Sequence, residues 1–116
     1  MTIMVVDPDP AEQQSLSILL SRLHSGATIV CFSDPLMAVK FGANNPVDAL
    51  YAVTVMRRLD GFALGKMLRG FQPKIQLHFI ADDETGRRDA MRILADSCIV
   101  RPVTAESIRR AETEEW

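Results

Sequence analysis

Several acidic side chains stand directly after short apolar runs in this sequence. Asp7-Pro8-Asp9 follows the run Ile3–Val6, and Asp82-Asp83 follows the run that ends at Ile80. Carboxylates in such places can ligate a divalent cation, act as nucleophiles or exchange protons with a substrate. These residue types are typical of sites that handle phosphate and Mg²⁺.

One apolar run, Ala49–Val55, carries no acid where a catalytic carboxylate would be expected. Its hydrophobic part ends at Val53-Thr54, and the next acid along the chain belongs to the pair Asp60-Gly61. Ligands bind beyond the carboxyl ends of the strands in parallel α/β sheets, so this position is chemically important. The sequence therefore keeps the frame of an acidic site and omits the acid.

Five apolar runs, each followed by apolar residues at helical spacing, predict five consecutive βα units. The first, third and fourth runs are continuously apolar, which is typical of parallel strands buried on both faces. The fold class is therefore α/β, a three-layer, flavodoxin-like, doubly wound sheet of five parallel strands in the order 2-1-3-4-5. The runs are Ile3–Val6, Ala27–Phe32, Ala49–Val55, Ile75–Ile80 and Cys98–Val100.

Capping residues and apolar spacing place the helices between these strands. The helices are expected to begin at Asp9 or Pro10, at Ser33-Asp34-Pro35, at Asp60-Gly61, near Asp83-Glu84-Thr85, and at Thr104, which has Ser107 three positions later. Each helix should bury one apolar face. The residues expected on those faces are Leu16, Leu19, Leu20 and Leu23; Leu36, Val39 and Ala43; Leu64, Met67, Leu68 and Phe71; Ala90, Ile93 and Leu94; and Ile108.

Length and composition favour one ordinary domain over residues 1–116. The net charge is −2, which argues against a nucleic-acid-binding surface over the whole domain. Cys31 and Cys98 lie in apolar runs and are expected to be buried free thiols in a reducing cytoplasm. The spacing of these cysteines and of His24 and His78 does not match that of zinc ligands. His24 is therefore interpreted as a helix-end residue and His78 as a sheet residue.

The order and spacing of these residues resemble the receiver domain of bacterial two-component response regulators, over the whole chain. That family typically has an acidic pair after the first strand and an aspartate at the end of the third, before an Asp-Gly. A Thr/Ser-Ala follows its fourth strand and a Lys-Pro its fifth. The residues that match this scaffold are Asp7, Asp60-Gly61, Ala81 and Pro102. The resemblance implies a CheY-like fold.

Most of the family's chemical residues are replaced. The resemblance places the phosphoacceptor at Val53, the second acid at Pro8, the hydroxyl at Ile80, the lysine at Arg101 and the aromatic switch at Cys98. A valine has no nucleophilic oxygen, and a proline offers no carboxylate to Mg²⁺. We therefore expect a pseudo-receiver without catalytic residues, metal or cofactor.

The replaced residues also predict how the emptied site packs. Val53 and Ile80 can pack together, and burying each would contribute roughly 1.5–3 kcal/mol. Asp7 needs a partner if it is buried, and Arg101 is the nearest candidate in the family's arrangement. We expect an Asp7–Arg101 ion pair over a Val53/Ile80 plug.

Asp7-Pro8-Asp9 supports an alternative of another class. It resembles the Asp-x-Asp of haloacid-dehalogenase-type Mg²⁺-dependent phosphatases, with Asp7 and Asp9 as nucleophile and general acid and Asp82-Asp83 as the later acids. The hydroxyl and lysine of that family are not convincingly placed. The other interpretation makes Asp9 a helix cap and gives Asp82 and Asp83 to the start of the fourth helix.

A charged surface is predicted around the fourth helix, fifth strand and fifth helix, which form the usual output and dimer surface of receivers. It contains Arg88, Arg92 and Arg109, and Asp96 could pair with such arginines across a two-fold axis or within the chain. The expected partners are therefore a signalling protein or a second copy, with no nucleic acid and no membrane.

Taken together, these patterns predict an atypical receiver domain in two-component signal transduction, related to phosphorelay proteins. It would be cytoplasmic, not an enzyme, and would act as a protein-interaction or dimerisation module. An alternative is the receiver part of a DNA-binding regulator cut near Trp116, although no recognition helix is visible. The charged tail Arg109–Trp116 would then be either a helix end or the start of a linker.

Overall fold

Strands and helices alternate along the whole described chain, as the sequence pattern predicts. The computed structural model describes residues 1–113. The five strands and five helices are β1 (Thr2–Val6), α1 (Pro10–Leu23), β2 (Thr28–Phe32), α2 (Pro35–Asn44), β3 (Ala49–Val53), α3 (Gly61–Phe71), β4 (Gln76–Ala81), α4 (Glu84–Arg92), β5 (Ser97–Val100) and α5 (Ala105–Thr113).

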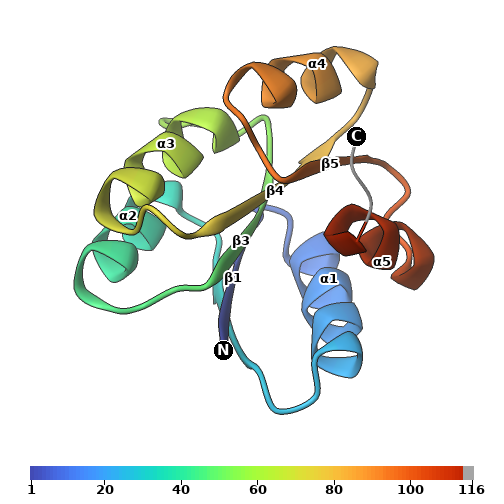
Figure 1. Cartoon of the computed structure of the whole chain (residues 1–116), viewed down its shortest axis with the longest axis horizontal. Coiled ribbons are helices and arrows are strands. Elements are labelled where there is room, and N and C mark those ends of the chain that lie inside the picture. The colour runs from blue at the N-terminus through green and yellow to red at the C-terminus, as the bar shows by residue number, and fades with distance from the viewer. Residues whose placement is uncertain (114–116) are drawn as a thin grey trace.

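The strands form one parallel sheet in the order β2-β1-β3-β4-β5, which confirms the predicted fold class (Figure 1). Strand β1 pairs with both β2 and β3, and each crossover connection carries a helix. Because all strands run the same way, their carboxyl ends meet at one rim of the sheet. That rim carries the residues that the sequence marked as a site.

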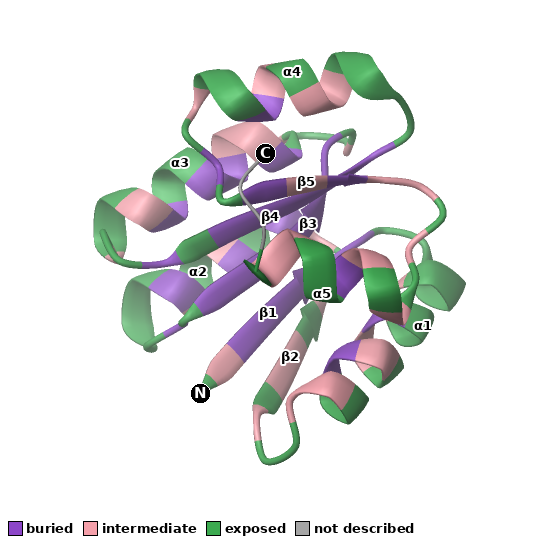
Figure 2. Cartoon of the chain, turned by 45° about the vertical axis from the view of Figure 1, so that its right-hand side comes forward, coloured by how far each residue is buried: buried purple, intermediate pink, exposed green. Residues whose placement is uncertain are grey.

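The sheet separates two hydrophobic cores. One core packs under α2, α3 and α4 and includes Leu64 and Phe79, and the other packs under α1 and α5 and includes Tyr51 and Ile108. Figure 2 shows the central strands β1, β3 and β4 buried along most of their length, whereas the edge strand β2 is partly exposed. The continuously apolar strands β1 and β3 are therefore covered on both faces, and β4 is covered as well although it contains Gln76 and His78.

Side-chain caps fix where the helices begin. The carboxylates of Asp9, Asp34, Asp60 and Asp83 each accept hydrogen bonds from backbone N–H groups in the first turn of the helix that follows. Thr104 and Ser107 cap α5 reciprocally, because the backbone N–H of each donates to the hydroxyl of the other at 2.8 and 3.0 Å. The five predicted helix starts are confirmed, and the structure selects which residue of each stretch is the cap.

The predicted buried faces of three helices are partly wrong. Leu36, Met67 and Phe71 are 46%, 43% and 51% exposed, because α2 and α3 bury a narrower strip than the apolar spacing suggested. Leu94 is 80% exposed, because α4 ends at Arg92 and Leu94 adopts a left-handed conformation with φ 58°. The sequence therefore overestimates the apolar surface that the sheet can cover.

The cysteine prediction is also partly wrong. Both thiols are free, but Cys31 is exposed on β2, where the edge of the sheet has no further strand to cover it, and Cys98 is half-buried. The histidines lie as predicted, with His24 at the end of α1 and His78 in β4. Within residues 1–113, no helix is both long enough and apolar enough to span a membrane. The expectation about Trp116 lies outside the described residues.

Candidate functional site

Val53 and Ile80 lie side by side at the carboxyl rim of the sheet. They occupy paired positions in the register of β3 and β4, and both belong to the core under α1 and α5. Their exposed fractions are 5% and 3%, so the position that the sequence resemblance assigns to a phosphoacceptor holds a buried aliphatic side chain. The expected Val53/Ile80 plug is present.

Asp7 stands at the end of β1 and is almost fully buried, with 4% of its surface exposed. Its Oδ1 accepts a hydrogen bond of 2.9 Å from the backbone N–H of Asp9, and its backbone carbonyl accepts one of 3.0 Å from Gln13 Nε2. Burial raises the pKa of the Asp7 carboxyl above its ordinary value, although the Asp9 hydrogen bond and the charge of Arg101 oppose the rise.

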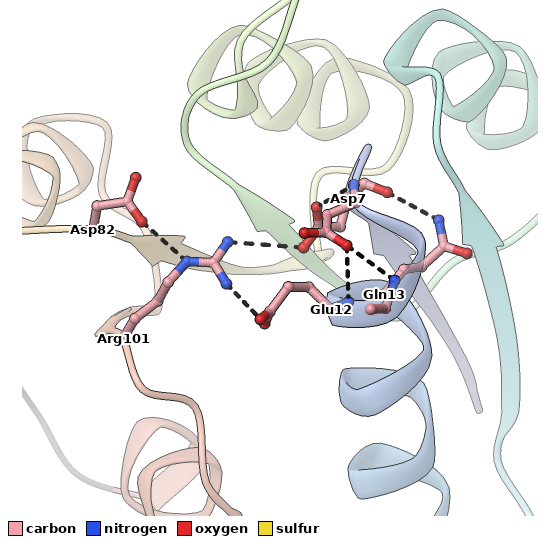
Figure 3. Close-up of polar contacts among 7 residues, drawn as sticks. Asp7, Glu12, Gln13, Asp82 and Arg101 are labelled. Carbon is pink, nitrogen blue, oxygen red and sulfur yellow. Dashed lines mark hydrogen bonds and ion pairs between the residues drawn. The ribbon is translucent and has the colours of Figure 1, made fainter.

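Arg101, directly after β5, gathers acidic side chains from three other elements (Figure 3). Its Nε donates to Asp82 Oδ1 at 3.0 Å and its Nη1 to Glu12 Oε2 at 2.9 Å, while Nη2 lies 3.8 Å from Asp7 Oδ2. The planar guanidinium offers several donors in one fixed fork, which a lysine ammonium could not match. The rim is therefore bridged across β1, α1 and the β4–α4 loop by one cation.

The predicted Asp7–Arg101 ion pair is confirmed, but it is the longest of the three contacts of the guanidinium. The sequence analysis missed Glu12 and assigned Asp82 to the start of α4, where Asp83 alone provides the cap. Glu12 could have been found from its place three residues after the Asp9 cap, because the first turn of α1 opens onto the same rim.

Asp9, the second acid of the loop after β1, caps helix α1. Asp9 Oδ1 accepts hydrogen bonds from the backbone N–H groups of Ala11 and Glu12, at 3.0 and 3.3 Å. Pro8, between the two aspartates, is exposed and has no side-chain oxygen. The Asp-x-Asp pattern of the phosphatase alternative is therefore divided between a buried carboxylate, Asp7, and a helix cap, Asp9.

A small pocket of about 220 Å³ opens above these residues, lined among others by Asp7, Val53, Ile80 and Arg101. The fold family implies Mg²⁺ in this place, and the lining does not fit it. Mg²⁺ requires near-octahedral oxygen coordination, whereas the side chains of Val53 and Ile80 supply no oxygen. Two further carboxylates line the pocket, but Asp9 caps α1 and Asp82 is paired with Arg101, which also places its positive charge beside Asp7. Among residues 1–113, no group of three or more potential ligand side chains is arranged to hold a metal ion.

Cys98, at the position of the aromatic switch, is half-buried in β5 and packs against the core under α2, α3 and α4. Burial raises the pKa of its thiol to about 11, so the side chain is a neutral thiol at physiological pH. A small, neutral side chain at this position has no ring to move between two orientations.

The four residues of the predicted interaction surface differ in their contacts. Arg88, Arg92 and Arg109 are exposed, and Arg92 pairs with Asp89 one turn earlier on α4 at 3.5 Å. Asp96 accepts a hydrogen bond of 2.7 Å from the backbone N–H of Leu77 and pairs with Arg69 at 3.3 Å, both within the chain. Its carboxylate therefore ties the start of β5 to β4 and α3.

Comparisons by sequence give no relative: no family model matches the chain, and no curated protein matches it. Many solved structures match its fold. The response regulatory domain of protein mrkE from Klebsiella pneumoniae is 29% identical, with a TM-score of 0.84 over 97% of this chain and 92% of that one.

Two further solved structures carry ligands in their names. The receiver domain of a sensor histidine kinase from Pseudomonas aeruginosa, with a magnesium ion coordinated in the active site cleft, is 18% identical, with a TM-score of 0.81 over 94% of this chain and 91% of that one. A chain of the CheX-CheY-BeF3-Mg complex from Borrelia burgdorferi is 17% identical, with a TM-score of 0.80 over 96% of this chain and 85% of that one. At these identities the likeness concerns the fold.

Proposed function

We propose that this chain, which has the receiver-domain fold of response regulators, is a signalling domain that does not accept a phosphoryl group and acts by binding other proteins. The observation that carries the proposal is Val53, an aliphatic side chain buried against Ile80 at the end of β3. Phosphoryl transfer to this position would need a nucleophilic oxygen, which valine lacks.

The charges around Val53 support the same proposal. A phosphoryl group brings negative charge and needs cations or donors that are free to receive it. Arg101, the cation nearest the plug, is already engaged by Asp82 and Glu12. An incoming phosphate would therefore have to break contacts at 3.0 and 2.9 Å and would meet three carboxylates.

The acids of the rim do not favour a phosphatase either. Asp9 would have to leave its two backbone donors to act as a general acid, and α1 would lose its cap. We propose that the domain is not an enzyme and that these carboxylates hold the rim together.

For its output we propose a protein partner or a second copy, docked on α4, β5 and α5 in the cytoplasm. This surface carries the exposed arginines Arg88, Arg92 and Arg109, and the exposed apolar residues Met91 and Leu94 lie on or beside α4. The domain by itself is proposed to bind neither nucleic acid nor membranes, whatever adjoins it in a longer regulator.

Incubation with acetyl phosphate and Mg²⁺, followed by intact-mass spectrometry, tests the proposal. We expect no phosphoryl adduct on the protein. The positive control is a fourfold variant that restores the family's residues. Its substitutions are Pro8→Asp, Val53→Asp, Ile80→Thr and Arg101→Lys. We expect this variant to gain a phosphoryl adduct that alkali removes.

A stable adduct on the unmodified chain would contradict the proposal, wherever it maps. Turnover of para-nitrophenyl phosphate that depends on Mg²⁺ and is lost in Asp7→Asn would instead support the phosphatase alternative.

A further inference from the structure

Helices α2 and α3 contain no acidic residue, although the chain has 15 acids and a net charge of −2. Their charged residues are Lys40, Lys66 and Arg69. Arg69 points toward α4 and donates to the carbonyls of Ile93 and Leu94 and to Asp96. Lys40 and Lys66 are exposed, and neither forms an ion pair within the described residues 1–113.

The same two helices expose large apolar side chains. Leu36 and Met37 of α2 and Met67 and Phe71 of α3 are 46%, 51%, 43% and 51% exposed. They make up four of the nine large hydrophobic residues that are exposed in the described chain, and α1, the longest helix, exposes only Ile18. Exposed apolar residues gathered on one side mark an interaction surface more often than scattered ones do.

Helices α2 and α3 pack directly against each other on the same side of the sheet (Figure 1). Gly42 of α2 lies against Leu68 of α3, and Gln72 donates from the end of α3 to the carbonyls of Gly42 and Asn45 at 2.8 and 2.7 Å. Met67 and Phe71 lie one turn apart on α3, as do Leu36 and Lys40 on α2. The line along which the two helices meet, called here the seam, is therefore flanked by helices that each carry exposed apolar residues and a lysine.

The loop before α3 adds positive charge at one end of this face. Arg57 and Arg58 are exposed, and Arg58 pairs with Asp34 at 3.5 Å, which joins the loop to the start of α2. Val55 of the same loop is 78% exposed. Together with Pro35 and Met56, these residues line a hollow of about 590 Å³ at the N-terminal end of α2.

We propose that the outer face of α2 and α3, formed by Leu36, Met37, Lys40, Lys66, Met67 and Phe71 and called here the α2–α3 face, docks an amphipathic acidic helix of a partner protein. Apolar residues of that helix at i, i+3, i+4 and i+7 cover the seam, and its flanking glutamates meet the two lysines and the loop arginines. The face is formed by other helices than the proposed α4–β5–α5 surface, so this inference goes beyond the proposed function and does not depend on it.

Methionine positions make the proposal directly testable. The probe is a synthetic N-acetylated helical peptide with leucines at i, i+3, i+4 and i+7 and glutamates at the other positions. In methyl spectra of the full chain labelled at methionine, we expect Met37 and Met67 to shift on titration. The exposed Met1 and Met91 lie elsewhere and should not shift, which provides an internal control.

Substitutions then distinguish binding at the α2–α3 face from non-specific hydrophobic binding. Met67→Glu is expected to weaken peptide binding by about tenfold or more, as for the loss of one anchor residue at an interface. Lys66→Glu should weaken it less, and Met91→Glu, the matched control at 50% exposure on α4, should leave it unchanged. Circular dichroism establishes that each variant is folded before the titration.

Several outcomes would overturn the proposal. One is a peptide with lysines in place of glutamates that binds as well as the acidic one; another is an acidic peptide that leaves Met37 and Met67 unmoved. Binding to phosphatidylcholine–phosphatidylserine vesicles without peptide binding would assign the face to a lipid surface. Self-association that Met67→Glu abolishes, again without peptide binding, would assign it to a second copy.

Discussion

Arg101 shows how a single residue can reorganise a site that the fold was built to hold. The receiver family, which this sequence resembles, has a lysine at this position. Its replacement joins Asp7, Glu12 and Asp82 around one guanidinium. Asp7 is the only one of these acids that is nearly inaccessible to water, so it depends most on the cation.

Replacing Arg101 with methionine should destabilise the domain by about 1–3 kcal/mol at neutral pH, because the buried carboxylate of Asp7 would lose its nearest cation. The double variant Asp7→Asn/Arg101→Met should recover part of that loss. Arg57→Met, at an exposed loop position, is the matched control and should change little. Urea denaturation measures all three, and equal stability of Arg101→Met and the unmodified chain would contradict this role.

His78 makes a second prediction at the scale of one residue. It is buried in β4, with Nδ1 2.7 Å from Ser97 Oγ and its ring stacked on Tyr51 at 4.7 Å. Burial lowers the pKa of His78 below its ordinary value of 6.5. Below pH 6.5 the unfolded chain therefore binds a proton that the folded chain does not, and stability falls as the pH falls.

The expected contribution of this one group is a slope of up to about 1.4 kcal/mol per pH unit below the unfolded pKa. His78→Gln removes the titrating ring, so its unfolding free energy should fall less steeply between pH 6.5 and more acidic conditions. Denaturant titrations of both proteins over that range measure the difference. If the unfolding free energies of the two proteins depended on pH in the same way, His78 would titrate alike in the folded and unfolded states, and the prediction would be wrong.

The site was predictable wherever residue type decided the chemistry. The side chains of Val53 and Pro8 have no oxygen in any conformation, so the loss of side-chain ligands and of a nucleophile could be predicted from the sequence. Of the three partners of Arg101, only Asp7 was predicted. The pairing with Asp82 and Glu12 could not be predicted, because it depends on the geometry of the loops. Which aspartate caps α4 was open for the same reason.

Among the elements, α3 illustrates how a helix is fitted to the sheet. Gly65 faces β4 so closely that an added Cβ would lie 2.7 Å from Phe79 Cζ and 3.2 Å from Leu77 Cδ1. A larger residue there would have to push the helix away from the core. Gly70, in the last turn of the same helix, faces open space.

These two glycines form a matched pair of predictions. Gly65→Ala should cost about 1–3 kcal/mol through overpacking. Gly70→Ala should be neutral or stabilise by up to about 1 kcal/mol, because alanine has the better helix propensity. Thermal or urea unfolding distinguishes them, and a Gly65→Ala variant as stable as Gly70→Ala would show that α3 can shift outward at no cost.

The elements were predicted with the right caps and order, but their buried faces were only half right. Capping depends on a few neighbouring residues, so Asp9 and Thr104 could be identified locally. Burial depends on how wide a strip the sheet can cover. Met67 and Phe71 continue the apolar spacing of α3 and still face water, which no local pattern separates from the core.

For the whole molecule, the order of five βα units was enough to predict the parallel sheet and its 2-1-3-4-5 order. The distribution of charge needed the structure. The carboxyl rim gathers acids around Arg101, while the α2–α3 face carries lysines and exposed apolar residues. The acids held by Arg101 support the proposed loss of phosphoryl transfer, and the α2–α3 face supports the proposed binding of a partner protein.

The most direct test of this account is an amide NMR titration of the unmodified chain with beryllofluoride and Mg²⁺, which together imitate the phosphorylated state of an active receiver. The account predicts that the signals of Asp7, Thr54, Asp82 and Arg101 stay in place at saturating concentrations. Saturable shifts confined to these residues would show that the rim still binds a phosphoryl mimic, and the account would be wrong.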